Sequence, residues 1–210
     1  AAKRMGMQLQ FANMVIERSA TVLFRWEASE EWPVHYVSDN VSQWGYEPTD
    51  LLSGATPFAS IIHPDDLSRV GEEVESHIAR GDLDFAQEYR IVKPSGEVIW
   101  VDDRTTVERD AAGTVLLLQG VVMDITVQKR AREVVVRSEQ KYRGLFESSR
   151  DAIMTMFPPD WRFSTANAAS MVLFAAKDAA SFAALGPADV SPERQPDGAL
   201  SSVAADSFRG

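Results

Sequence analysis

The stretch that decides the fold is GEVIWVDDRTTVERDAAGTVLLLQGVVMDIT, residues 96–126. Residues 97–109 and 114–124 are two strand-length runs with a two-residue period, and the residues between them favour a turn. A third run of the same kind, residues 83–92, precedes them across another turn-rich segment. The three runs predict an antiparallel three-stranded meander.

Upstream of this meander the sequence predicts two further strands and several short helices. Residues 21–28 and 33–38 are aromatic or β-branched runs around a polar break, which is typical of two strands joined by a turn. Brief segments broken by glycine and proline follow at 40–45, 48–54 and 56–62. Helical turns of this length are not stable alone, so we expect them to pack on the sheet.

A longer helix is expected between His63-Pro64-Asp65-Asp66 and Gly81. Proline suits the first turn of a helix, and either aspartate can accept backbone N–H bonds there. Gly81 is a typical C-terminal cap. Apolar residues recur at steps of three and four along one face of this helix, at Leu67, Val70, Val74 and Ile78.

Two amphipathic helices are predicted to flank this block. In residues 1–18, apolar side chains at helical spacing include Phe11, Met14 and Val15. Residues 127–147 lack proline and place residues at alternating four- and three-residue steps, which are Ala131, Val135, Ser138, Tyr142 and Leu145. This spacing predicts a short two-stranded coiled coil. The alternative is a helix that packs on its own domain.

The order of these elements resembles the PAS family with its C-terminal PAC motif. The resemblance is carried by short pieces in a fixed order, which are Tyr36-Val37-Ser38-Asp39-Asn40-Val41, Gly45-Tyr46, Ile62-His63-Pro64-Asp65-Asp66, Glu88-Tyr89-Arg90, Gly96-Glu97, Trp100-Val101, Arg109-Asp110, Gly113, Gly120 and Asp124-Ile125-Thr126. A second copy begins near Lys141-Tyr142-Arg143-Gly144-Leu145-Phe146-Glu147 and continues through Asp151-Ala152-Ile153 and Asn167-Ala168-Ala169. Its last three strands are missing.

The resemblance implies an α+β fold with a five-stranded antiparallel sheet cupped by small helices. It divides the chain into an N-terminal helix (1–18), a PAS domain (19–126), a signalling linker helix (127–147) and an incomplete second PAS domain (148–210). Without its final strands we expect the last segment to be loosely ordered, or completed by another chain.

The family senses ligands, redox state or light and passes the result to a kinase, cyclase or other output domain. We therefore expect a regulatory module with no catalysis of its own, in a homodimer formed through its flanking helices. The sequence contains no phosphate-cradling glycine loop and no nucleophile–base set. A ligand-free dimerisation scaffold is the alternative function.

Composition excludes several classes of site. The absence of cysteine removes disulfides, thiolate zinc sites and any cysteinyl–flavin adduct. The net charge of −10, without a cluster of Lys and Arg, disfavours nucleic-acid binding. No run approaches the ~20 apolar residues of a membrane span. No membrane contact is expected of this stretch, and its acidity fits a cytoplasmic module.

The resemblance places a ligand cavity between the sheet and the long helix. We predict that its lining includes ten side chains, which are Tyr36, Trp44, Val70, Val74, Tyr89, Ile91, Val101, Asp103, Leu118 and Val122. Flavin-reading amides of the light sensors would fall on Ile91, Val101 and Val122, which cannot hydrogen-bond a flavin edge. The cofactor is therefore unknown. We expect a cavity without a cofactor, ahead of one that holds a non-covalent flavin or a haem near His77.

Asp103 is the one inward-facing charged group. It is either a ligand anchor or, as we favour, the partner of Tyr89 in a cross-strand hydrogen bond. On the opposite face we expect two cross-strand charge pairs, Arg90–Asp102 and Glu88–Arg104. An apolar stripe on that face is predicted to be covered by the N-terminal helix, and Asp124, Ile125 and Thr126 to relay movement of the last strand into the linker helix.

Overall fold

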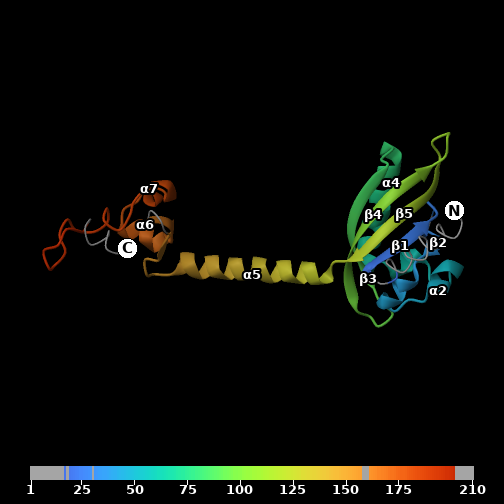
Figure 1. The fold of residues 1–210 in the computed structure, drawn as a ribbon, viewed down its shortest axis with the longest axis horizontal. Coiled ribbons are helices and arrows are strands. Elements are labelled where there is room, and N and C mark those ends of the chain that lie inside the picture. Colours follow the sequence, from blue (N-terminus) through green and yellow to red (C-terminus); the bar gives the residue numbers. More distant parts are fainter. Residues whose placement is uncertain (1–16, 18, 30, 158–160, 202–210) are drawn as a thin grey trace, which may run out of the picture. The chain divides into compact units, whose positions relative to one another are not determined.

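A computed structural model describes residues 17, 19–29, 31–157 and 161–201. The chain divides into two compact units, Ala1–Arg132 and Glu133–Gly210 (Figure 1). The predicted N-terminal helix, with Phe11, Met14 and Val15, lies outside the described residues. Within those residues no helix is both long and apolar enough to span a bilayer. They also contain no cluster of three or more acidic or histidine side chains that could hold a metal ion.

The first unit is built on one five-stranded antiparallel sheet in the order β2-β1-β5-β4-β3. The strands are β1 (Thr21–Trp26), β2 (Val34–Val37), β3 (Asp84–Val92), β4 (Val98–Arg109) and β5 (Val115–Asp124). Burial alternates along β3 and β4, so one face of the sheet contacts the core. This confirms the predicted fold class, and the three predicted meander strands match β3, β4 and β5 closely.

Short helices and one long helix cover the core. They are the 3-10 helix η1 (Asp39–Trp44), α2 (Pro48–Ser53), α3 (Phe58–Ile61) and α4 (Pro64–Arg80). Figure 1 shows α4 lying along the sheet. Gly81 ends α4 at φ +79°, as predicted. The ring of His63 caps the N-terminus of α4, because its Nδ1 accepts a hydrogen bond from the Asp65 N–H at 3.3 Å.

The predicted charge pairs across β3 and β4 are wrong, because the register is shifted by two residues. Arg90 lies opposite Trp100, and Glu88 lies opposite Asp102. The observed turn closes at Lys93 and Glu97, where the Lys93 N–H donates to the Glu97 carbonyl at 2.8 Å. A slip of two residues keeps each side chain on its predicted face but changes every partner.

Helix α5 (Thr126–Ser148) follows β5 and crosses from one unit into the other. The second unit then contains β6 (Met154–Phe157), β7 (Arg162–Ala166), α6 (Ala168–Leu173) and α7 (Ala179–Ala183). Strands β6 and β7 form a two-stranded sheet. Asn167, which is fully buried, caps α6 and donates to the carbonyls of Phe146 and Asp151. That this unit is an incomplete PAS domain remains a prediction.

Candidate functional site

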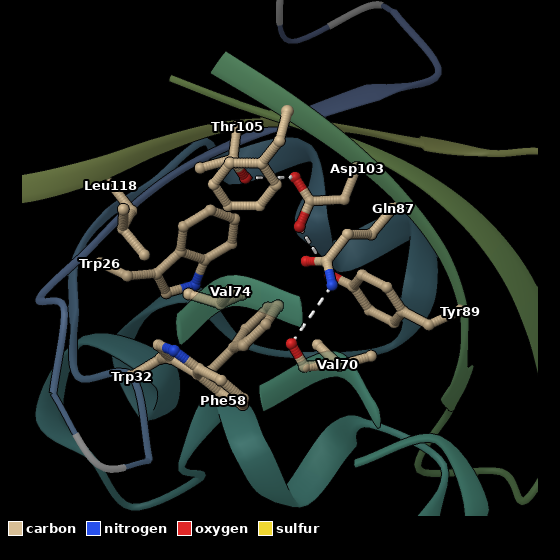
Figure 2. Close-up of a pocket in the computed structure, with 11 residues that line it drawn as sticks. Trp26, Trp32, Phe58, Val70, Val74, Gln87, Tyr89, Asp103, Thr105 and Leu118 are labelled. Carbon is tan, nitrogen blue, oxygen red and sulfur yellow. Dashed lines mark hydrogen bonds between the residues drawn. The ribbon is translucent and has the colours of Figure 1, made fainter. Parts of the chain in front are cut away.

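The core of the first unit contains a small cavity of about 20 Å³. Figure 2 shows aromatic side chains on one side of it, with the polar Gln87, Tyr89 and Asp103 opposite. Its lining comes from β1, the segment between β1 and β2, α3, α4 and the three meander strands. The residues are Trp26, Trp32, Phe58, Val70, Val74, Phe85, Gln87, Tyr89, Asp103, Thr105 and Leu118.

The polar side of the cavity is organised around the buried carboxylate of Asp103. The Tyr89 hydroxyl donates to Oδ2 at 2.8 Å and the Thr105 hydroxyl donates to Oδ1 at 3.0 Å. The predicted Tyr89–Asp103 hydrogen bond is therefore confirmed, although Gln87 is the residue directly opposite Asp103. Burial raises the pKa of Asp103 to about 6. Burial, together with the neighbouring carboxylate, also raises the pKa of Tyr89.

The aromatic side is packed around Trp26, which is 3% exposed. Its ring stacks on Phe24 at 5.2 Å and contacts Phe58 at 4.9 Å, measured between ring centroids. It also lies over Gly120, where an added methyl group would come within 2.1 Å of the indole. The glycine in β5 therefore provides the space that Trp26 fills.

The indole N–H of Trp26 is a buried donor without a hydrogen-bond partner among the described residues. A cavity of this volume has room for about one water molecule. In this packing it does not fit a flavin or a haem, whose ring systems need several hundred Å³. His77 is not in the lining, because its ring stacks on Phe85 and its Nδ1 lies 2.7 Å from Asp82 Oδ2.

The ten residues that were predicted to line the cavity fall into three groups in the structure. Five line the cavity, and these are Val70, Val74, Tyr89, Asp103 and Leu118. Four are buried elsewhere in the core, and these are Trp44, Ile91, Val101 and Val122. Tyr36 is 44% exposed, because the strand pairing shifts at Arg25/Trp26 and leaves two adjacent residues of β2 facing outward.

Sequence reasoning missed the aromatic half of the lining. Trp26 and Phe58 were not assigned to the cavity, and neither were Trp32 and Phe85. The alternation in β1, which buries Val22, Phe24 and Trp26, is a signal that would have found Trp26. No sequence signal places Trp32, which follows β1 in an irregular segment.

A charged network links α4 to the sheet near the cavity. Gln87 donates to Glu73 at 2.8 Å, and Arg69 bonds both Glu73 and the backbone carbonyl of Glu88. Beside it, the Asp66 carboxylate accepts the backbone N–H of Arg90 and two bonds from its guanidinium. These bonds hold the pKa of Asp66 near 2. The charged partner of Arg90 is thus in α4 and not in β4.

The start of α5 is attached to β4 at Trp100. The Trp100 N–H donates to Thr126 Oγ1 at 2.9 Å, and the Ile125 N–H donates to the Trp100 carbonyl at 2.9 Å. The Lys129 ammonium lies 4.9 Å from the centre of the Trp100 ring and pairs with Glu88. Asp124 Oδ1 accepts the Thr126 N–H. The first turn of the helix is therefore fixed by contacts to β3, β4 and β5.

Comparison with known proteins identifies the first unit. The model of the PAS fold family matches residues 34–122. Residues 34–122 form a PAS fold domain. A crystal structure of a sensory box histidine kinase/response regulator from Burkholderia thailandensis superposes with a TM-score of 0.51 at 26% identity. The superposed region covers 66% of this chain and 99% of the Burkholderia chain.

Two curated relatives of this PAS domain are sensors. The methyl sulfide methyltransferase-associated sensor of Methanosarcina acetivorans is 41% identical over 122 residues, which are 58% of this chain and 12% of that protein. The two-component sensor PprA of Pseudomonas aeruginosa is 33% identical over 97 residues, which are 43% of this chain and 10% of that protein. The chain thus spans about a tenth of each relative's length.

Proposed function

We propose that the PAS domain is a non-catalytic input module that passes a change in its core to helix α5, and through α5 to a kinase or cyclase domain of a longer protein. The main support for this proposal is that β5 connects the cavity directly to the helix. Leu118 lines the cavity, Gly120 supports Trp26, and β5 runs from there into the Asp124–Thr126 junction. A sensor role is supported by the relatives, which are themselves sensors.

A second connection runs through side chains. Gln87 contacts the cavity on one side and Glu73 on the other. From Glu73 the contacts continue to Arg69 and to Glu88, whose carboxylate pairs with Lys129 in the first turn of α5. A rearrangement of the cavity lining would therefore reach α5 through both the β5 backbone and this network.

We further propose that α5 pairs with a second copy of itself. Val135, Tyr142 and Leu145, on the predicted seam, are 65%, 59% and 64% exposed. Ala131 and Ser138 are also exposed. A helix with an uncovered apolar seam gains stability when a second helix buries it. In a parallel pair, a rotation or shift at Thr126 would be carried about 30 Å along the helix.

Charged substitutions in the seam test this function. The double variant Val135→Glu/Leu145→Glu is expected to be monomeric where the parent is dimeric, with a dimer Kd raised about a hundredfold or more, because the carboxylates would be buried without partners. Native mass spectrometry and output of the full-length protein are the measurements. The matched control is Arg137→Glu/Gln140→Glu, which adds charge off the seam and should leave both unchanged. Unaltered dimer mass and output in the seam variant would refute the proposal.

The small cavity favours the second candidate function, a ligand-free scaffold. A cavity with room for about one water cannot hold a metabolite unless the lining rearranges. Native mass of the purified protein separates the two functions. A surplus of a few hundred daltons would support a ligand-binding sensor, and a clean dimer mass would support the scaffold.

A further inference from the structure

Two polar atoms in the lining of the core cavity have no hydrogen-bond partner among the described residues. One is a donor, the buried indole N–H of Trp26. The other is an acceptor, the side-chain carbonyl oxygen of Gln87. The amide nitrogen of Gln87 is fully used, because it donates to the Val70 carbonyl at 3.2 Å and to Glu73 at 2.8 Å. The lining therefore contains one unpaired donor and one unpaired acceptor.

The orientation of the Gln87 amide is fixed by its two partners. A backbone carbonyl and a carboxylate only accept hydrogen bonds, so the nitrogen must face Val70 and Glu73. A reversed amide would place oxygen against oxygen in both contacts. Figure 2 shows the carbonyl oxygen of Gln87 turned into the cavity, opposite the edge of the Trp26 ring that carries the nitrogen. Donor and acceptor thus face the same space without contacting one another.

The space between the two groups suits one water molecule. Its volume is about 20 Å³, and a buried water needs roughly 10–15 Å³ and two to four polar partners. Asp103 supplies a third partner beside Trp26 and Gln87. Its carboxylate accepts one hydroxyl on each oxygen and retains the capacity for a further bond. A water in this position would make three hydrogen bonds.

We propose that the core cavity is a binding site for one water molecule, which accepts the Trp26 N–H and donates to Gln87 Oε1 and to the Asp103 carboxylate. This site goes beyond the proposed function, because it specifies what occupies the core and not how a change there reaches α5. A small molecule that displaces this water must bring its own donor and acceptor, since otherwise buried polar groups lose their partner.

The bound water also stabilises the ionised form of Asp103. The titratable or charged groups around this carboxylate are Tyr89 on β3, Asp102 on β4, and Glu73 and Arg69 on α4, which lie beyond Gln87. The lining residues from β1, α3 and β5 are uncharged. No cation therefore pairs with the carboxylate, and hydrogen-bond donors alone stabilise its charge. A donor to a carboxylate lowers its pKa, so loss of the water should raise the pKa of Asp103.

Contacts between water and the indole protons test the site on the intact chain. Nuclear Overhauser spectra are expected to show a cross-peak between the Trp26 indole N–H and a long-lived water. Trp44 is the matched control, because its N–H is also buried and unpaired but lies outside the cavity lining. The Trp26 cross-peak should persist in Tyr89→Phe and in Thr105→Val, which excludes transfer through a hydroxyl proton. No cross-peak at Trp26, an equal one at Trp44, or its loss in either variant would overturn the site.

A variant that fills the cavity tests the effect of the water on Asp103. Val70→Ile adds one methylene group to a buried side chain of the lining and is expected to displace the water. The pKa of Asp103, followed by carbon-13 NMR of its carboxyl group, should then rise by about one unit. Val121→Ile, on the exposed face of β5, is the control and should change neither the pKa nor the Trp26 cross-peak.

Two results in Val70→Ile would contradict the proposal. Persistence of the Trp26 cross-peak would show that the water is not in this cavity. An unchanged pKa of Asp103 after loss of the cross-peak would overturn the hydrogen bond from the water to the carboxylate.

Discussion

Replacement of Gly120 by alanine is expected to lower the free energy of unfolding of the PAS domain by about 2–4 kcal/mol. The new methyl group would lie 2.1 and 2.2 Å from two ring carbons of Trp26 and 3.1 Å from Asp103 Oδ1. Trp26 cannot move aside without losing its packing on Phe24 and Phe58. The clash therefore outweighs the gain of up to about 1 kcal/mol that alanine normally brings to a strand.

Gly71→Ala is the matched control for this substitution. It lies in the same unit, and its methyl group would make an ordinary contact of 3.7 Å with Trp32. Alanine is favoured over glycine inside a helix, so this variant should be unchanged or about 0.5–1 kcal/mol more stable. Urea unfolding followed by tryptophan fluorescence measures both variants. Equal stability of Gly120→Ala and the parent would show that Trp26 is not held over Gly120.

Replacement of Asp103 by asparagine is expected to change the pH dependence of stability. Because burial raises the pKa of Asp103 from 3.8 to about 6, the native state binds a proton that the unfolded state has already lost between those pH values. The free energy of unfolding therefore falls as the pH rises from about 4 to about 6, by about 3 kcal/mol in total. Above that window the folded domain holds a buried charge.

Asparagine keeps the shape and hydrogen-bonding capacity of the side chain beside Tyr89 and Thr105 without the charge. Relative to the parent, Asp103→Asn should therefore gain about 3 kcal/mol between pH 4 and pH 8. The control is Asp102→Asn, in which the outward neighbour paired with Arg104 is changed. Denaturant unfolding at a series of pH values gives the comparison. A difference between Asp103→Asn and the parent that does not vary with pH would contradict the buried ionised state.

The sheet could be predicted from sequence because its signals are local. Turn residues around Gly96 and Gly113, with two-residue alternation between them, define three strands and the face of each side chain. The partners across β3 and β4 could not be predicted with the same accuracy. They depend on where the turn closes, and the observed closure at Lys93 and Glu97 shifts the pairing by two residues from the predicted one. A shift of two residues leaves every side chain on its predicted face.

The cavity was less predictable than the sheet because its contents depend on packing in three dimensions. Alternation correctly turned Asp103 and Tyr89 inward, but it cannot show that Trp26 from a neighbouring strand fills the space above Gly120. Tyr36 failed as a lining residue for a related reason. The irregularity in the pairing of β1 with β2 changes the direction of its side chain, and no residue type in β2 signals it.

In the proposed relay, the cavity lining and the start of α5 are coupled. Amide hydrogen exchange at Ile125 and Lys129, in Trp26→Phe compared with the parent, tests it most directly. Ile61→Val, a small core change outside the cavity lining, is the control for general destabilisation. Coupling predicts that Trp26→Phe accelerates exchange at these two amides about tenfold more than Ile61→Val does at equal global stability. Equal protection in the two variants would contradict the claim that the core of this domain controls its helix.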